Sequence, residues 1–181
     1  ITSSLQMEAS RKLGMSAKNT MQVAQRLYQN GLITYMRTDG VQIGEEGISE
    51  IRSTIDNIFG NEYVPTDSNA YASKVTNAQE AHEAIRPTDT NINPERVNGD
   101  FSKEEKDLYA LIWKRTLASQ MQNWRGLRTT INISNKEMDI NLRVSGTVTL
   151  FNGFGLCMKK EEKIHLKKKL KSFLSLKKNN H

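Results

Sequence analysis

Residues 31–39 read GLITYMRTD and place a phenol and a guanidinium two residues apart, at Tyr35 and Arg37. In an extended chain, residues i and i+2 point to the same face, so the two side chains could meet one ligand. A tyrosine hydroxyl can attack a phosphodiester to give a covalent phosphotyrosine, although an ordinary phenol pKa of about 10 keeps it mostly neutral at pH 7. A neighbouring guanidinium favours the phenolate and can hold two phosphate oxygens at once. The pair therefore suits phosphate chemistry.

A second segment, residues 78–88, reads AQEAHEAIRPT and carries His82 and Arg86 four positions apart. On a helix these two residues share one face. The histidine could bind phosphate or move a proton near neutral pH, and both residues are candidate DNA contacts. Spacing alone leaves the structural alternatives open, namely a packed tyrosine beside a surface charge and a histidine without a ligand.

Residues 2–39 resemble the region of bacterial topoisomerase I that leads to its active-site tyrosine, and the string ITYMRTD closely matches that family's signature. The string QEAHEAIRPT is similar to a second signature of the same family, in the right order and at a fitting distance. The likeness covers about residues 1–155. Met36 is more similar to topoisomerase I than to topoisomerase III, which tends to have proline there. Gly40 departs from the family's usual serine, which would remove one hydrogen bond and add backbone freedom.

The resemblance implies a piece of a type IA DNA topoisomerase, which cuts one DNA strand by transesterification, lets another strand pass and reseals the break without ATP, so that negative supercoils relax. It implies Tyr35 as nucleophile, Arg37 as the cation that positions the phosphate, and His82 as a DNA contact near the scissile bond. In the family, Mg²⁺ is bound by an acidic cluster in a domain that precedes the residue matching Ile1. We therefore expect no metal site and no small-molecule cofactor in this chain, and no relaxation by the chain alone. The expected partners are single-stranded DNA and negatively supercoiled DNA.

Two other interpretations stay open. One is a noncatalytic DNA-binding module, in which a pair of helices holds phosphates with basic side chains. These residues are Arg11, Lys12, Lys18 and Arg26. The other is a nonfunctional gene remnant, suggested by the missing initiator methionine and by an abrupt change of composition after residue 155.

The tyrosine is expected to leave a pair of short helices. Ser3 or Ser4 could cap the first helix and Gly14 end it, and Ser16 could cap the second, which Asn30 and Gly31 stop. Residues Met21, Ala24, Leu27 and Tyr28 would form the apolar face of the second helix. Two helices joined by a glycine-containing turn are typical of a winged-helix core.

Three more helices are predicted downstream. Residues 45–59 carry isoleucines at helical spacing, which predicts a helix with one buried face. These residues are Ile48, Ile51, Ile55 and Ile58. Residues 78–85 could form a short helix that ends before Pro87. Ser102 and Glu105 form a capping box for a helix to about residue 121, with Leu108, Leu111, Ile112 and Trp113 as its buried positions.

From Trp124 onward, apolar residues recur at every second position instead of about every 3.6 positions. This pattern predicts a β-hairpin with one apolar face. We expect further strands to cover that face, because a two-stranded ribbon is marginally stable alone. The expected fold class is mainly α with a C-terminal β-hairpin. We divide it into a winged-helix-like (CAP-like) tyrosine domain (residues 1–121), part of the family's β-rich arch (residues 122–155), and a lysine-rich tail (residues 156–181). The tail is interpreted as non-native or disordered, with a basic amphipathic helix as the alternative.

The net charge of +6 is not a simple nucleic-acid signal. The tail holds nine lysines and two glutamates, a net +7, which leaves the remaining residues at −1. DNA binding must therefore rest on local residues. No apolar run approaches the roughly 20 residues that span a bilayer, and the N-terminal residues lack the basic and apolar regions typical of a signal peptide. We therefore expect the protein in the cytoplasm, at the nucleoid. Cys157 is a single cysteine without a metal-ligand pattern.

Overall fold

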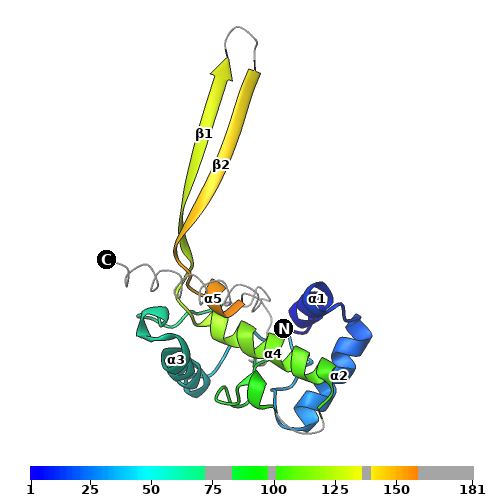
Figure 1. The fold of residues 1–181 in the computed structure, drawn as a ribbon. Coiled ribbons are helices and arrows are strands. Elements are labelled where there is room, and N and C mark those ends of the chain that lie inside the picture. The colour runs from blue at the N-terminus through cyan, green and yellow to red at the C-terminus, as the bar shows by residue number, and fades with distance from the viewer. Residues whose placement is uncertain (72–82, 98–100, 136–139, 159–181) are drawn as a thin grey trace, which may run out of the picture.

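The computed structural model describes residues 1–71, 83–97, 101–135 and 140–158. They form a helical body from which a β-hairpin projects (Figure 1). The elements, in chain order, are α1 (Thr2–Leu13), α2 (Ala17–Gln29), α3 (Glu45–Phe59), η1 (Asn61–Tyr63), η2 (Pro94–Arg96), α4 (Lys103–Ser119), β1 (Arg125–Asn135), β2 (Ile140–Phe151) and α5 (Gly155–Met158). The predicted class, helices followed by a hairpin, is confirmed for these residues. None of the helices in the described ranges is both long and apolar enough to cross a bilayer.

Local capping signals set the bounds of the first two helices. Ser16 is the N-cap of α2, as predicted, and its hydroxyl accepts a hydrogen bond from the Asn19 amide at 3.2 Å. Gly14 ends α1 with φ 69°, a left-handed conformation that glycine adopts without a steric penalty. The predicted caps at Ser3 and Ser4 are wrong, because α1 begins at Thr2, with Ile1 at the N-cap position, and both serines lie inside the helix.

The core of the body is built around α4, which lies between the α1–α2 pair and α3 in Figure 1 and contacts all three helices. The predicted capping box is confirmed: the Ser102 amide donates to the Glu105 carboxylate, and the Glu105 amide donates to the Ser102 hydroxyl. Leu108 is fully buried, and Leu111, Ile112 and Trp113 are at most 8% exposed. The buried face of α4 was therefore identified correctly.

The isoleucine stripe of α3 is only partly core. Ile51 and Ile55 are completely buried, whereas Ile58 is 46% exposed and Ile48 is half-buried. The prediction for Ile58 is wrong, because periodicity identifies one face of a helix but not how far neighbouring elements cover that face. Gly60, with φ 99°, then turns the chain out of α3.

The hairpin is antiparallel, with Leu127 opposite Val148 and Ile131 opposite Val144. Its predicted apolar face is confirmed, and the large side chains on it are 55–70% exposed: Leu127, Ile131, Ile133, Leu142, Val144, Val148 and Leu150. Residues 136–139, between the two strands, lie outside the described residues. At the base of the hairpin, the Phe151 ring stacks on Tyr63 at 4.9 Å and lies under the Arg125 guanidinium at 5.2 Å.

After the hairpin the chain returns to the body. The Phe154 amide donates to the Gln122 carbonyl at 2.8 Å, and α5, which was not predicted, packs on α4. The buried Cys157 thiol donates to the Lys114 carbonyl at 3.4 Å, and its burial raises the pKa of that thiol to about 11. Residues 159–181, which hold almost the whole predicted tail, lie outside the described residues.

Candidate active site in the tyrosine loop

Residues 31–42, here called the tyrosine loop, follow α2 and carry both residues expected to act on phosphate. Two apolar members of the loop are buried in the core, with Ile33 1% and Met36 0% exposed. Tyr35 lies between them and is 49% exposed, and Arg37 is also exposed. The backbone bends at Met36 and Arg37, so the extended geometry expected there is wrong. The burial of Ile33 and Met36 nevertheless leaves the phenol and the guanidinium at the surface.

The second signature segment runs beside the tyrosine loop. The Thr34 amide donates to the Arg86 carbonyl at 2.9 Å, and the Arg86 amide donates to the Thr34 hydroxyl at 2.9 Å. That hydroxyl in turn donates to the Ala84 carbonyl at 2.8 Å. Ile33 and Pro87 add an antiparallel bridge. Two strings that are 52 positions apart in the chain thus meet in space at the residue before Tyr35.

The far end of the tyrosine loop is held by the same segment. Gln42 forms a parallel bridge with Glu83, and the Ala84 amide donates to the Gln42 carbonyl at 2.9 Å. Residues 83–85 are therefore not helical, and the predicted helix over residues 78–85 is wrong at these positions. The rest of that helix, and the candidate DNA contact His82, lie outside the described residues.

The start of α1 holds the tyrosine loop from its other side. The Thr2 amide donates to the Thr38 carbonyl at 2.9 Å, and the Thr38 amide donates to the Thr2 hydroxyl at 2.9 Å. The Thr2 hydroxyl also lies 2.8 Å from the Met36 carbonyl, to which it donates. Gly40, where the resemblance expects serine, still donates its amide to the Thr38 hydroxyl at 2.9 Å. The backbone on both sides of Tyr35 is thus fixed by non-local hydrogen bonds.

Arg37 and Arg86 lie in different environments. Arg37 makes no hydrogen bond and no ion pair with any described residue, so its guanidinium is available to an anion. The Arg86 side chain is 15% exposed and donates to the Glu83 carboxylate at 2.7 Å and to the Pro87 carbonyl at 2.9 Å. It also packs on α3, where a Cβ at Gly47 would lie 3.3 Å from the Arg86 Cζ. Arg86 therefore joins the second segment to α3.

Tyr28, in the last turn of α2, lies against Tyr35. The two ring centroids are 5.3 Å apart at an interplanar angle of 67°, an edge-to-face arrangement. Tyr28 was expected on the buried face of α2, but it is 41% exposed, and Val23 is fully buried instead. The expectation failed because a helical pattern does not show where the next loop will fold back.

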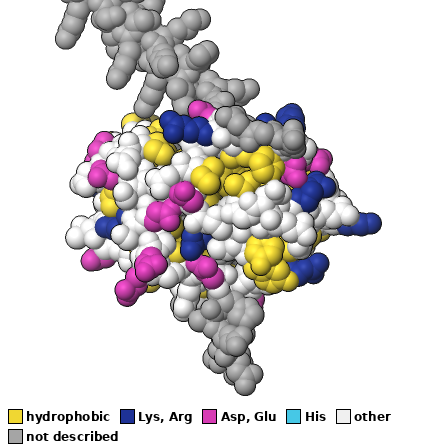
Figure 2. All heavy atoms as spheres, turned by 90° about the horizontal axis from the view of Figure 1, so that it is seen from below, with side chains coloured by type: hydrophobic (Ala, Val, Ile, Leu, Met, Phe, Trp, Pro, Cys, Tyr) yellow, Lys and Arg dark blue, Asp and Glu magenta, His cyan; other side chains and the backbone are white. Residues whose placement is uncertain are grey.

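The four other candidate DNA contacts lie on α1, α2 and the residues next to them. Arg11 and Lys12 are 71% and 39% exposed and pair with Glu8 at 3.8 and 2.9 Å. Lys18 is exposed at the start of α2, and Arg26 is 51% exposed near the end of α2. Figure 2 shows acidic side chains gathered mostly on the left, and most Lys and Arg side chains on the right, which is the side of α1 and α2 in Figure 1.

Arg26 is also part of the capping structure of α4. Its Nε donates to a Glu105 carboxylate oxygen at 2.8 Å. Burial alone would raise the pKa of the Glu105 carboxyl, but hydrogen bonds from Ser102 and the charge of Arg26 outweigh it and lower that pKa below its ordinary value. The same balance is found at Glu8, whose pKa is lowered by its hydrogen bond with Lys12.

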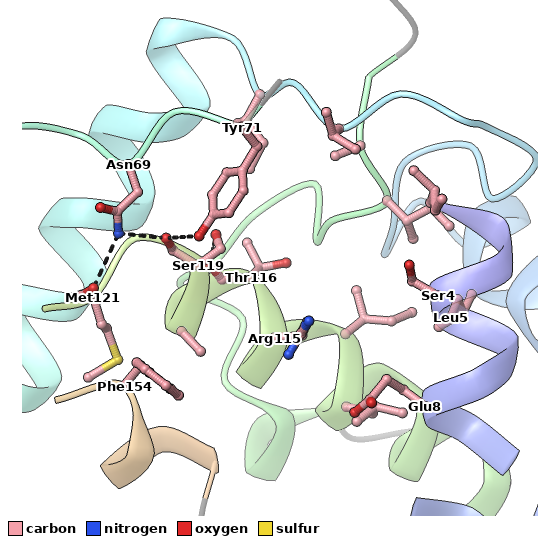
Figure 3. A pocket seen from close by; sticks show the side chains of 18 of the residues that line it. Ser4, Leu5, Glu8, Asn69, Tyr71, Arg115, Thr116, Ser119, Met121 and Phe154 are labelled. Atoms are coloured by element: carbon pink, nitrogen blue, oxygen red, sulfur yellow. Dashed lines mark hydrogen bonds between the residues drawn. The ribbon is translucent and has the colours of Figure 1, made fainter. Parts of the chain in front are cut away.

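A cavity of about 370 Å³ lies between α1, α4 and the segments around residues 41–43, 69–71 and 84–85. Figure 3 shows Arg115 of α4 reaching into this space, with Ser4, Leu5 and Glu8 of α1 on the opposite wall. On the other side, the Tyr71 hydroxyl donates to the Ser119 carbonyl at 2.8 Å. Val41, near the end of the tyrosine loop, lines the cavity, whereas Tyr35 and Arg37 do not.

The described residues do not gather three His, Cys, Asp or Glu side chains in a position to hold a metal ion. The Mg²⁺ that the resemblance implies therefore finds no such group of ligands in this part of the chain.

Comparison with known proteins gives one consistent likeness. A family model described as DNA topoisomerase matches residues 1–180. The DNA topoisomerase 1 of Rickettsia conorii is 48% identical over 162 residues, which cover 85% of this chain and 21% of that protein. The DNA topoisomerase 1 of Zymomonas mobilis is 51% identical over 153 residues, covering 84% of this chain and 12% of that protein.

Among solved structures, the full-length topoisomerase I from Thermotoga maritima is similar to this chain with a TM-score of 0.74 and 36% identity. The match covers 89% of this chain and 26% of the solved chain. The chain therefore spans about a fifth of the Rickettsia relative and about a quarter of the solved chain.

Proposed function

Because the chain belongs to the bacterial DNA topoisomerase family, we propose that it carries the strand-cleaving nucleophile of a type IA enzyme and that this nucleophile is Tyr35. The phenolic oxygen attacks the phosphorus of a DNA phosphodiester and forms an O–P bond, while the bond from phosphorus to the 3′ oxygen breaks. The 3′ oxygen leaves with a proton, and the 5′ phosphate stays on the tyrosine. Reversal of the step reseals the strand without ATP.

One observation carries the proposal: Tyr35 is half exposed on a loop whose backbone is fixed on both sides. A nucleophile must reach the phosphorus within a narrow range of geometries, and a fixed backbone supplies that preorganisation. Ile33 and Met36 anchor the loop in the core, while Thr34 and Thr38 bind it to neighbouring segments. A structural tyrosine would have its ring packed into the apolar interior instead.

Arg37 is proposed as the phosphate-positioning cation. It is exposed two residues after the nucleophile and has no partner among the described residues. Its planar fork can hold the non-bridging oxygens whose charge develops in the transition state. His82 is proposed as a DNA contact from the resemblance alone, whereas Arg86 acts by holding the second segment against α3.

Single-stranded DNA is proposed to approach from the side of α1 and α2, where Arg11, Lys12, Lys18 and Arg26 offer exposed cations to its phosphates. In this interpretation α1 and α2 belong to a winged-helix-like tyrosine domain, and the hairpin belongs to a β-rich arch. Relaxation of negatively supercoiled DNA, in the cytoplasm at the nucleoid, is proposed for the whole enzyme. By the resemblance, the Mg²⁺ that supports it would be bound by another domain of the whole enzyme, so we propose that the 181-residue chain relaxes no DNA by itself.

The test is a chimera in which residues 1–155 replace the matching segment of the Rickettsia conorii relative. We expect the chimera with Mg²⁺ to cut a labelled single-stranded oligonucleotide and to trap it covalently on denaturation. Tyr35→Phe removes the attacking oxygen and should abolish the covalent complex while oligonucleotide binding stays within about twofold. A noncatalytic binding module, which the exposed cations of α1 and α2 would also suit, predicts that Tyr35→Phe changes no assay. A covalent complex that persists in Tyr35→Phe would refute the proposal.

A further inference from the structure

Fixing the backbone of the tyrosine loop does not by itself fix the reactive oxygen. The hydrogen bonds of Thr2, Thr34 and Thr38 hold the main chain, but the phenol is attached through two side-chain torsions. A change between staggered wells at the first torsion would move the hydroxyl by several ångströms. The Tyr35 side chain makes no hydrogen bond to any described residue, so a packing contact must select its orientation.

The ring of Tyr28 provides such a contact. Its centroid is 5.3 Å from that of Tyr35, with an angle of 67° between the planes. This is the edge-to-face geometry that aromatic pairs prefer, because the positive edge of one ring meets the negative face of the other. Among the described residues, it is the only ring contact that Tyr35 makes.

The backbone of Tyr28 is held in place at the end of α2 by the burial and the hydrogen bonds of its neighbours. The preceding Leu27 is completely buried, and the Leu32 amide donates to the Leu27 carbonyl at 2.9 Å. The Gly31 amide donates to the Tyr28 carbonyl at 2.9 Å, and Gly31 has φ 71°, so the chain reverses directly after the helix. This reversal brings Tyr35 back against Tyr28, only seven positions later.

We propose that Tyr28 is a positioning residue for the cleavage reaction: its ring holds the Tyr35 phenol in the orientation that presents its oxygen to the scissile phosphorus. The proposal rests on the proposed function of Tyr35. The ring is the active part, and the Tyr28 hydroxyl is not required. Because the Tyr28 ring is engaged with Tyr35, it contributes to the rate of the covalent step and not to the affinity for DNA.

The experiment compares Tyr28→Leu, which removes the ring, with Tyr28→Phe, which keeps it. Gln22→Leu is the matched control, since Gln22 is also exposed on α2 and no side-chain hydrogen bond or ring contact joins it to the described residues of the tyrosine loop. In the chimera, single-turnover cleavage of a single-stranded oligonucleotide and its dissociation constant are measured separately. In the full 181-residue chain, the ring resonances of Tyr35 and the urea midpoint are followed for the same variants.

Tyr28→Leu should slow cleavage by about 3- to 10-fold, which is the range that one aromatic contact supports. The dissociation constant and the urea midpoint should stay unchanged, and the Tyr35 resonances should shift as the ring-current effect of Tyr28 is lost. Tyr28→Phe and Gln22→Leu should cleave within about twofold of the parent. Together these results support the proposal.

Three results would overturn it: parental cleavage by Tyr28→Leu, a loss in Tyr28→Phe equal to that in Tyr28→Leu, or a loss of DNA affinity as large as the loss of rate. The last result would assign Tyr28 to stacking on a DNA base instead. If Tyr35→Phe retains the covalent complex, the function of Tyr35 has failed. If Tyr35→Phe is inactive and Tyr28→Leu is normal, only the role of Tyr28 has failed.

Discussion

The Thr34 hydroxyl joins the two signature segments, and its removal should have a measurable cost. It donates to the Ala84 carbonyl at 2.8 Å and accepts from the Arg86 amide at 2.9 Å. Thr34→Val keeps the branched shape and deletes both bonds. A typical hydrogen bond contributes about 1 kcal/mol, and a buried partner left unpaired costs up to about 3 kcal/mol. Since this site is only partly buried, we expect the free energy of unfolding to fall by about 2 kcal/mol in total.

Urea and thermal unfolding of the 181-residue chain measure this cost. For a chain of this size, 2 kcal/mol corresponds to a fall of about 4–8 °C in the unfolding midpoint. Thr34→Ser keeps the hydroxyl and should lose much less. Thr147→Val, on an exposed position of β2, should change the free energy by less than about 0.5 kcal/mol. If Thr34→Val unfolds with the parental midpoint and an unchanged urea slope, these hydrogen bonds do not hold the tyrosine loop in place.

Two further predictions concern stability at low pH and association. The pKa of Glu105 is lowered in the folded state, so its carboxylate stabilises the fold above its ordinary pKa, and that contribution is lost as the pH falls through the lowered value. Glu105→Gln preserves the capping-box pattern but removes the charge that pairs with Arg26. In urea unfolding, it should lower the free energy of unfolding at pH 7 by about 1 kcal/mol, and the difference should shrink towards pH 3. The exposed apolar face of the hairpin should make the chain self-associate at high concentration. The double variant Leu142→Thr, Val144→Thr should reduce that association by severalfold in sedimentation experiments and leave the unfolding midpoint unchanged. Arg143→Thr, on the opposite face of the hairpin, should not reduce the association.

Features that depend on neighbours in sequence could be predicted. The capping box of Ser102 and Glu105, the cap at Ser16 and the helix stop at Gly14 involve atoms within a few residues of each other, so the sequence pattern contains all the partners. The alternation that produced the hairpin is local in the same sense. These elements formed where the sequence pattern indicated them.

Features that depend on a distant partner could not be predicted in the same way. Residues 83–85 have helix-favouring composition, but Glu83 pairs with Gln42 and Ala84 bonds to both Gln42 and Thr34, which holds the segment extended. Tertiary hydrogen bonds thus override local propensity. Tyr28 fits an apolar stripe, yet it is 41% exposed, and its ring packs against Tyr35 of the following loop and not in the core. A helical period cannot reveal that meeting.

The same distinction explains how the candidate site is built. Tyr35 and Arg37 are named by a local string, but their exposure depends on Ile33 and Met36 being drawn into a core formed by other helices. The orientation of the loop depends on hydrogen bonds from α1 and from the second signature segment. Because the hydroxyl of Tyr35 takes no part in these bonds, its chemistry can be removed without removing the loop's support. A loss of cleavage in Tyr35→Phe would therefore report on the reaction itself, whereas a loss in Thr34→Val would report on positioning.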